Sequence, residues 1–298
     1  MPRRKDIWRC GLIRKPAAEL LRDGALAKVE AAWLDEGEEF TFLADPFGWR
    51  DETGFHLFAE RYDYRTRHGA IDVFDFDAAL KLADRRPCLE EPWHLSYPAV
   101  FAGDGAVWML PEAYRSGKLT LYRQIGGLTD WRAECTITLD TLSVDTTPLR
   151  YRGRWWLFYS PATSKATRFG HLHVAYADRL TGPWTPHPKN PVRIDRRSCR
   201  PGGTPLVLGD RIMLPTQDCS KTYGGAVRPL WITRLDETGF ASSAGEPLPF
   251  PANAPPGTEG MHTFSACGDV TLIDVKKIDR SFRGLMLDLK RKLKRCGF

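Results

Sequence analysis

The sequence has no long apolar run and no obvious leader segment. No stretch approaches the 18 apolar residues that suggest a membrane-spanning helix. The first residues, MPRRKDIWRCGLIRKP, are basic but contain no apolar run long enough for a signal peptide. We therefore expect a chain that does not span a membrane and lies in the cytoplasm.

Paired cysteine motifs are also missing. The seven cysteines are scattered and odd in number, and none forms a C-x-x-C pair. This pattern indicates neither a zinc knuckle nor a disulfide framework, and we expect reduced thiols.

The excess of positive charge is small and unevenly placed. The formal net charge is +6, and the segment 276–295 alone holds nine Lys or Arg against two Asp. Because the middle of the chain is close to neutral, the charge does not indicate a nucleic-acid groove.

Helical patterns are scarce before the C-terminus. The two candidates are PAAELLRDGALAKVEAAW (16–33) and FDAALKLADRR (76–86). Elsewhere the chain alternates, is rich in aromatic and β-branched residues, and is broken by Gly and Pro. This pattern predicts short antiparallel strands.

One segment recurs along the chain. ADPFGWRDETGFHLFAE (44–60) matches SYPAVFAGDGAVWMLPE (96–112) and, more weakly, VDTTPLRYRGRWWLFYS (144–160). A fourth copy is GGTPLVLGDRIMLPTQD (202–218), and a shorter fifth begins at GMHTFSACGDVTLIDV (260–275). Each copy reads as a strand, a tight turn with Gly, and an aromatic-rich strand.

The repeat has the period of a propeller blade. A third alternating strand follows each of the first four copies, at 69–76, 118–125, 171–178 and 228–235. Copy starts near 45, 97, 145, 204 and 262 give five blades. We predict an all-β, five-bladed β-propeller over residues 1–279, in which a strand at 7–13 closes the ring, followed by a short basic C-terminal helix in 280–298. A β-sandwich with fortuitous similarity is the alternative.

Propeller geometry explains why acidic residues stand at both ends of a hairpin. A residue that starts the first strand and a residue that ends the second lie at the same mouth of the channel, as Asp45 and Glu60 do. The same mouth should hold Glu112, Tyr97, Asp145, Ser160, Thr204, Gln217, Asp218 and His262. Converging acids push their pKa values apart, which suits general acid and base chemistry on a glycosidic bond. Asp-Pro at 45–46 could also be no more than a turn.

Two sets of candidate residues follow. The catalytic candidates are Asp45, Asp145, Glu112 and Glu60. The substrate-binding candidates are Trp93, His94, Tyr97, Arg200, Gln217, Asp218, Tyr223 and His262. Trp93 is the candidate for stacking on a sugar, whereas Trp155 and Trp156 should pack between blades. No ligand spacing requires a metal or other cofactor, although an ion in the channel near His262 is possible.

Several blocks of the sequence are similar to a known group. The stretches 44–60, 145–160 and ADRLTGPWTPHPKNPV (177–192) resemble the five-bladed glycosidases of the family-43 type. HLSYPAVF, MLPEAY, PTQDCSKTYGGAV and GMHTFSACGDVTLID together resemble the N-terminal propeller domain of glucosamine inositolphosphorylceramide transferases and its bacterial relatives.

The resemblance implies a catalytic set that this chain carries only in part. In the hydrolases, a base, a pKa-tuning acid and a proton donor stand at blade starts. Asp45 matches the base and Asp145 the second acid. The proton-donor Glu is expected where this chain has GGTPL around Thr204, so a donor would have to come from Glu60, Glu112 or Asp218. The fold therefore carries over more directly than the chemistry.

The C-terminal tail reads as a short basic amphipathic helix. Phe282, Leu285, Leu289 and Leu293 recur at three- and four-residue steps, and Lys290, Arg291, Lys292, Lys294 and Arg295 surround them. The helix could lie on an anionic surface at the inner membrane face, or pack on the propeller with its charges in solvent.

Three functions remain open at this point. The first is an enzyme that cleaves or transfers a glycosyl group in cell-surface glycan or glycolipid assembly, with a carbohydrate, sugar nucleotide or lipid-linked sugar as substrate. The second is a glycan-binding propeller without turnover. The third is a scaffold that recruits a partner glycosyltransferase to a membrane. We favour the first, while the sugar, the stereochemical outcome, the proton donor and the oligomeric state stay open.

Overall fold

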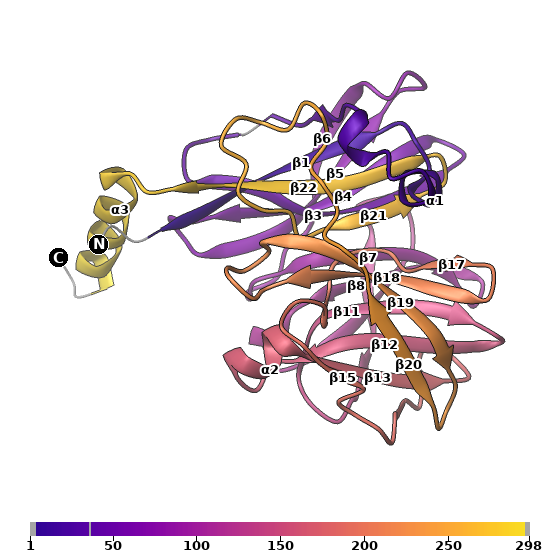
Figure 1. Cartoon of the computed structure of the whole chain (residues 1–298). Helices are drawn as coiled ribbons and strands as arrows, with labels where there is room; N and C mark the ends of the chain where they lie inside the picture. Colours follow the sequence, from indigo (N-terminus) through magenta and orange to yellow (C-terminus); the bar gives the residue numbers. More distant parts are fainter. Residues whose placement is uncertain (1–3, 36, 296–298) are drawn as a thin grey trace.

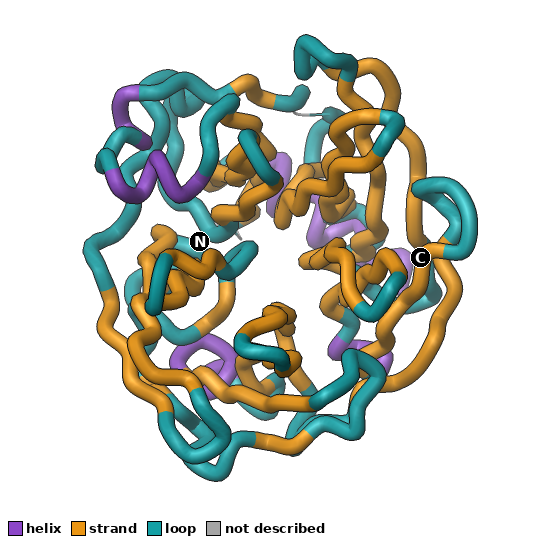
Figure 2. The backbone as a smooth tube through the Cα atoms, turned by 90° about the vertical axis from the view of Figure 1, so that its right-hand side faces the viewer, coloured by secondary structure: helices purple, strands orange, loops and turns teal. Residues whose placement is uncertain are grey.

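The strands form five antiparallel sheets around a central axis. The computed structural model describes residues 4–35 and 37–295. Figure 1 shows the sheets from the side, and Figure 2 shows them arranged in a ring. The predicted five-bladed propeller is confirmed, and the β-sandwich alternative is wrong.

Three blades follow one another in simple order. Blade 1 consists of β3 (Thr41–Asp51), β4 (Gly54–Asp63), β5 (His68–Phe76) and β6 (Leu82–Leu89). Blade 2 consists of β7 (Ser96–Gly103), β8 (Ala106–Glu112), β9 (Leu119–Gln124) and β10 (Trp131–Ile137). Blade 3 consists of β11 (Ser143–Tyr151), β12 (Arg154–Pro161), β13 (His171–Ala177) and β14 (Thr185–Pro186), with β15 (Arg193–Ile194) also paired to β13.

The last two blades are less regular. Blade 4 has an interrupted inner edge and consists of β16 (Arg200–Pro201), β17 (Leu206–Leu208), β18 (Arg211–Asp218), β19 (Ala226–Leu235) and β20 (Phe240–Ala244). Blade 5 consists of β21 (Phe264–Cys267), β22 (Val270–Asp279), β1 (Lys5–Ile13) and β2 (Ala32–Trp33).

The N-terminal strand closes the ring, as the sequence predicts. β1 pairs antiparallel with β22 without a break, from Lys5 opposite Asp279 to Ile13 opposite Thr271. Blade 5 is therefore built from both ends of the chain, which ties the first and last thirds of the sequence together.

Apolar side chains fill the spaces between neighbouring blades. Trp155 packs with Leu110 and Leu121 of blade 2, and Trp156 packs with Leu214 and Leu230 of blade 4. Both tryptophans are buried, so the prediction that they pack between blades is confirmed.

The helix predicted at 16–33 is much shorter in the structure. Only α1 (Ala17–Arg22) and a 3-10 turn (Leu26–Lys28) are helical, and the segment ends in β2. Gly24 lies between them with φ of 57°, a left-handed conformation that ends a helix.

The helix predicted at 76–86 is wrong. β5 ends at Phe76, and β6 then runs along the outer edge of blade 1. The strand lacks apolar alternation because ion pairs to β5 replace it: Arg85 binds Asp72 and Arg86 binds Asp75. The sequence of this polar edge strand therefore resembles that of a helix.

Two short helices stand at one end of the propeller in Figure 1. These are α2 (Lys165–Gly170), which follows β12, and α3 (Phe282–Arg295), which follows β22. None of the helices in the described residues has the length and apolar character needed to cross a bilayer. Six cysteines, Cys10, Cys88, Cys135, Cys199, Cys219 and Cys267, are free thiols.

Candidate active site

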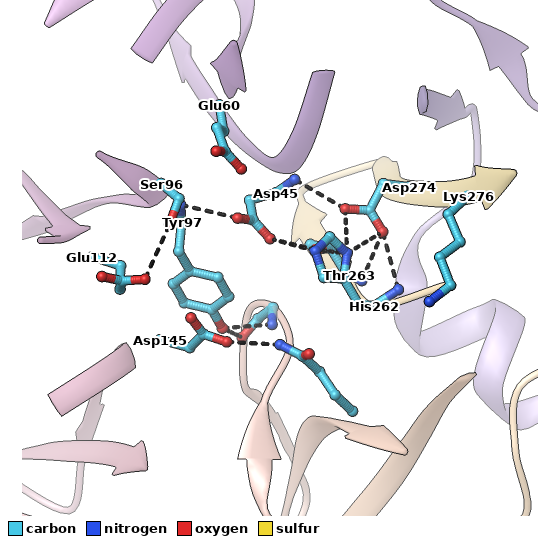
Figure 3. A network of polar contacts seen from close by, with 12 residues as sticks. Asp45, Glu60, Ser96, Tyr97, Glu112, Asp145, His262, Thr263, Asp274 and Lys276 are labelled. Carbon is cyan, nitrogen blue, oxygen red and sulfur yellow. Dashed lines mark hydrogen bonds and ion pairs between the residues drawn. The ribbon is translucent and has the colours of Figure 1, made fainter. Parts of the chain in front are cut away.

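A local backbone kink begins the inner strand of three blades. Asp45, Tyr97 and Asp145 have φ of 51°, 48° and 48°, which non-glycine residues adopt only rarely. At each of them the strand pairing shifts, because β3, β7 and β11 each carry a bulge there. A bulge turns a side chain away from the regular alternation of the strand. In Figure 3 these three side chains, from different blades, lie around one space.

Four acidic side chains share that space. Asp45, Glu60, Glu112 and Asp145, called here the carboxylate cluster, come from blades 1, 2 and 3 and are 3–6 % exposed. Figure 3 shows their carboxyl groups gathered around Tyr97. The structure thus brings together the four residues that the sequence selects as catalytic candidates.

Asp45 is the centre of a hydrogen-bond network between blades 1, 2 and 5. Its Oδ2 accepts from the backbone N–H of Tyr97 (3.1 Å), and its Oδ1 accepts from Oγ1 of Thr263 (3.2 Å). Nε2 of His262 lies 3.3 Å from the same Oδ1. Asp45 is therefore held in one orientation by donors from two other blades.

Asp274 orients the histidine of this network. It is fully buried, and its carboxylate accepts from Nδ1 of His262 (2.7 Å) and from the backbone N–H groups of His262, Thr263 and Asp45. With Nδ1 bound to Asp274, His262 directs Nε2 at Asp45. The arrangement is a carboxylate–histidine–carboxylate chain.

Burial and the neighbouring charges change the pKa values of Asp45 and His262. Burial, partly offset by the charge of His262, raises the pKa of Asp45 to about 6. For His262, burial is the largest influence and lowers the pKa, but the charges of Asp274 and Asp45 outweigh it, and the pKa is raised. Near neutral pH, Asp45 is thus mainly ionised, and the adjacent imidazole of His262 binds its proton more tightly than a free histidine does.

Aromatic rings enclose His262. Trp8 of β1 stacks on its imidazole with ring centroids 3.6 Å apart, and Tyr223 meets it edge-on at 5.4 Å. Lys276 is buried beside both rings, with Nζ 3.3 Å from Asp6. The histidine cannot turn away from Asp45 without displacing Trp8.

Asp145 is bound on both of its oxygens. Arg200 donates from Nε to Oδ2 (2.6 Å) and from Nη2 to Oδ1 (3.1 Å), and Nε2 of Gln217 donates to Oδ2 (2.7 Å). The guanidinium of Arg200 also lies over the rings of Tyr223 (5.0 Å) and Phe169 (5.6 Å). Asp145 and Arg200 form a buried ion pair, which suits a positioning or charge-tuning role.

Glu112 contacts neutral groups. It accepts from the backbone N–H of Tyr114 (2.9 Å) and from Oγ of Ser96 (3.3 Å). Burial, reinforced by the charge of Asp145, raises its pKa to about 7. The side chain therefore exchanges its proton near neutral pH.

Glu60 lies against a neutral histidine. Nε2 of His94 is 3.5 Å from its Oε1, and burial, followed by the charge of Arg115, lowers the pKa of His94 to about 4. Burial and the charges of Asp45 and Glu112 raise the pKa of Glu60 well above its usual value. Glu60 therefore holds its proton more tightly than an ordinary glutamate does, beside Asp45.

Tyr97 closes the channel beneath the cluster. The side chain is fully buried, packs edge-on against Phe47, and its hydroxyl accepts from the backbone N–H of Gly203 (2.7 Å). The same hydroxyl shares a hydrogen bond with Thr147 (2.8 Å). Tyr97 thus connects blades 2, 3 and 4 through the ring centre.

Half-buried aromatic side chains stand around the cluster. Tyr62, Tyr114, Phe169 and Tyr223 come from blades 1 to 4, and Phe169 stacks on Tyr223 at 5.8 Å. Arg168 lies over the ring of Tyr114 (5.3 Å). Such rings offer the flat apolar faces on which sugar rings pack.

Two predicted residues lie outside this arrangement. Asp218 ends β18, where it binds Arg228 (3.0 Å) and Ser220 (2.5 Å) instead of another acid. Trp93 packs against the apolar core between blades 1 and 2. The substrate-binding roles of Trp93 and Asp218 stay predictions.

Blade 4 has no acid at its inner start because two glycines are needed there. A Cβ on Gly203 would lie 2.1 Å from the carbonyl oxygen of Phe264, and one on Gly202 would lie 2.5 Å from that of His262. Gly203 also has φ of 131°, which side chains rarely adopt. The close approach of blades 4 and 5 therefore excludes an acidic side chain at Gly202 and Gly203, and the adjacent Thr204 is neutral.

An ion near His262 stays a prediction. Asp45, His262 and Asp274 each offer a ligand atom, and these atoms lie within 4.8 Å of one another. The groups fit a cation only if His262 loses the proton between Nε2 and Asp45, since Nδ1 is already directed at Asp274. As described, the three residues satisfy one another without an ion.

Several important residues were not found from the sequence. Asp274 ends the apolar run VTLID, and a single carboxylate in such a run is a sequence signal for a buried polar contact. Trp8 is about 250 positions from His262, so only the closure of the ring brings them together. Tyr114 and Phe169 carried no pattern that separates them from core residues.

Comparison with known proteins agrees with this architecture. The family described as "Glucosamine inositolphosphorylceramide transferase 1, N-terminal" matches residues 28–246. A protein of that name, glucosamine inositolphosphorylceramide transferase 1, from Oryza sativa subsp. indica is 32 % identical over 208 residues, covering 68 % of this chain and 28 % of the relative. The Arabidopsis thaliana protein of the same name is 33 % identical over 202 residues, covering 66 % and 26 %. The chain thus spans about a quarter of the length of these relatives.

Solved structures share the fold. A thermostable family-43 glycoside hydrolase superposes with a TM-score of 0.53 at 14 % identity, covering 75 % of this chain and 84 % of the hydrolase. The resemblance predicted from the sequence blocks is confirmed. The match to residues 28–246 ends before His262, Asp274 and α3, so these features belong to the part of the chain outside it.

Proposed function

Because the chain belongs to the family of the N-terminal part of glucosamine inositolphosphorylceramide transferase 1, we propose that it is a carbohydrate-active enzyme. It would cleave or transfer a glycosyl group at the carboxylate cluster, in the assembly of a glycolipid or cell-surface glycan. The observation that carries the proposal is the gathering of Asp45 with two further buried acids, Glu60 and Glu112, whose pKa values are raised.

The cluster supports division of the work between base and acid. Asp45, held by Tyr97 and Thr263, would act as base or nucleophile, with His262 fixing its orientation. Glu112 or Glu60 would give a proton to the leaving oxygen. Asp145, paired with Arg200, would tune the charge of the site.

Basic groups at the mouth favour a substrate that carries a phosphate. Arg168 lies over the ring of Tyr114, and Arg115, the next residue along the chain, is exposed. A guanidinium group binds phosphate oxygens well. A sugar nucleotide or a sugar on a phosphorylated headgroup therefore suits the site better than a neutral polysaccharide.

A glycan-binding propeller without turnover is the second candidate. The observation that favours it is the absence of an acid at Gly202–Thr204, where the similar hydrolases are expected to carry the proton donor, together with the ion pair that occupies Asp145. In this version the aromatic rings and arginines bind the sugar, and the acids shape the pocket only.

The experiment compares three forms of the chain: wild type, Asp45→Asn, and Asp210→Asn. Asp210 is the matched control, because it is exposed in the turn between β17 and β18. Each form is incubated with glucosamine, inositol, their phosphates and sugar nucleotides, and both the heat of binding and the amount of product are measured. We expect turnover to fall by on the order of 10²–10⁴ in Asp45→Asn and to persist in Asp210→Asn. Binding without turnover in the wild type would support the second candidate. Full turnover in Asp45→Asn would overturn the proposed mechanism.

A further inference from the structure

The C-terminal helix α3 is placed with its polar face on the protein. Gly284 and Asp288 are buried, and Arg291 is half-buried; these residues lie at steps of four and three along one side of the helix. Lys5 binds Asp288 (2.7 Å) in a buried ion pair, and Arg291 donates to the backbone carbonyl of Tyr64 (2.9 Å). The helix is therefore fixed by charge and hydrogen bonds.

The opposite side of α3 is apolar and open. Phe282, Met286, Leu289 and Leu293 are 69 %, 39 %, 45 % and 55 % exposed. Their steps of four, three and four place them on one face, called here the apolar stripe. A helix in a globular protein normally turns such a stripe toward the core. Here the orientation is the reverse.

Positive charge borders the apolar stripe. Arg283 and Lys290 are exposed on the same helix. The segment 280–295 carries seven Lys or Arg against one Asp, and that Asp is the one bound to Lys5. The side chains of Lys292, Lys294 and Arg295, and residues 296–298, lie outside the part of the chain that the structure describes.

We propose that α3 docks the protein on an anionic lipid bilayer, with the apolar stripe inserted at the headgroup level. Apolar residues flanked by Lys and Arg are the features that bind helices to anionic lipid surfaces. A second copy of the chain fits less well, since pairing two stripes would bring two strongly basic segments together. The contacts that hold α3 survive docking because they lie on the other face.

The position of α3 relates this surface to the carboxylate cluster. Arg291 contacts Tyr64, which directly follows β4, and β4 carries Glu60. Figure 1 shows α3 at the same end of the propeller as α2, whose Phe169 lies over Arg200. Docking through α3 thus brings the mouth to the lipid surface. The inference stands on the helix itself and does not depend on the catalytic proposal.

The test is co-sedimentation of the full chain with vesicles. We expect binding to phosphatidylcholine vesicles that contain phosphatidylglycerol, much weaker binding to phosphatidylcholine alone, and loss of binding at high salt. The variant Leu289→Glu/Leu293→Glu should bind at least about tenfold less. Lys290→Glu changes the charge by two units and should weaken binding roughly 25-fold.

Ile125→Glu is the matched control. Ile125 is 59 % exposed and lies in the turn after β9, away from α3, so its replacement should leave vesicle binding unchanged. Thermal unfolding of each variant checks that the exposed substitutions leave the propeller folded. No binding to anionic vesicles, or equal binding by Leu289→Glu/Leu293→Glu, would overturn the proposal. A wild-type dimer in sedimentation velocity that this variant dissociates, without vesicle binding, would assign the stripe to a second copy and overturn it as well.

Discussion

Two pairs of carboxylates in the same propeller are buried to a similar degree but differ in their partners. Asp145 and Asp274 each bind a basic side chain, Arg200 or His262, and further N–H donors. Glu60 and Glu112 meet neutral groups: His94, Ser96 and the backbone of Tyr114. Burial alone favours the protonated form of a carboxyl group, whereas partners of opposite charge and hydrogen-bond donors favour the ionised form.

The four acids therefore differ in role: Asp145 and Asp274 position neighbouring side chains, whereas Glu60 and Glu112 are the candidates for proton transfer. Asp145 fixes the position of Arg200, and Asp274 fixes the position of His262. Both contacts help to shape the mouth of the channel. Glu60 and Glu112 have raised pKa values and lie in the same cluster as Asp45.

The largest expected effect comes from breaking the Asp145–Arg200 pair. Asp145→Ala leaves a buried guanidinium without its carboxylate, and the free energy of unfolding should fall by about 3–5 kcal/mol. The double variant Asp145→Ala/Arg200→Met removes both charges and should recover most of this loss. Urea unfolding of the wild type, both single variants and the double variant measures the coupling. Additive losses would contradict the account of Asp145 as a paired, positioning residue.

A smaller effect is expected for the pH dependence of stability. The pKa of Glu112 is raised from its usual value near 4.5 to about 7, so the folded chain binds this proton more tightly than the unfolded chain does. Stability from this group is therefore fully present below pH 4.5 and is lost as pH rises to about 7. The loss is at most about 3 kcal/mol at 1.36 kcal/mol per unit. Glu112→Gln carries no titrating group and should lose less stability than the wild type between pH 5 and pH 8.

Glu259→Gln is the control for this titration. Glu259 is exposed and bound to Arg280, which lowers its pKa to about 2. Because this pKa is lowered, Glu259 adds to the free energy of unfolding above pH 4.5, and that addition is lost only as the pH falls below 4.5. Between pH 5 and pH 8, the free energy of unfolding of Glu259→Gln should therefore change with pH as it does in the wild type. A Glu112→Gln variant with the wild-type slope would mean that Glu112 is ionised throughout.

The sequence predicted the part of the site that the repeat itself contains. Asp45 and Glu60 recur in register with Tyr97 and Glu112, so blade geometry was enough to place them at one mouth. The sequence also predicted the closure of blade 5. It did not predict the stacking of Trp8 on His262, because that contact depends on the tertiary packing of both ends of the chain. Local pattern failed where charge replaced hydrophobicity, as in β6, whereas the short basic C-terminal helix that it predicted is confirmed as α3.

The central claim is that Glu60 and Glu112 have pKa values well above that of an ordinary glutamate while they share the mouth of the channel with Asp45. The most direct test is a pH titration of the glutamate side-chain carboxyl ¹³C resonances by NMR, with Glu112→Gln and Glu60→Gln to assign the two signals. The account predicts a midpoint of about 7 for Glu112 and a midpoint well above 4.5 for Glu60. Midpoints near 4.5 for both would contradict it, and with it the assignment of either residue as the proton donor.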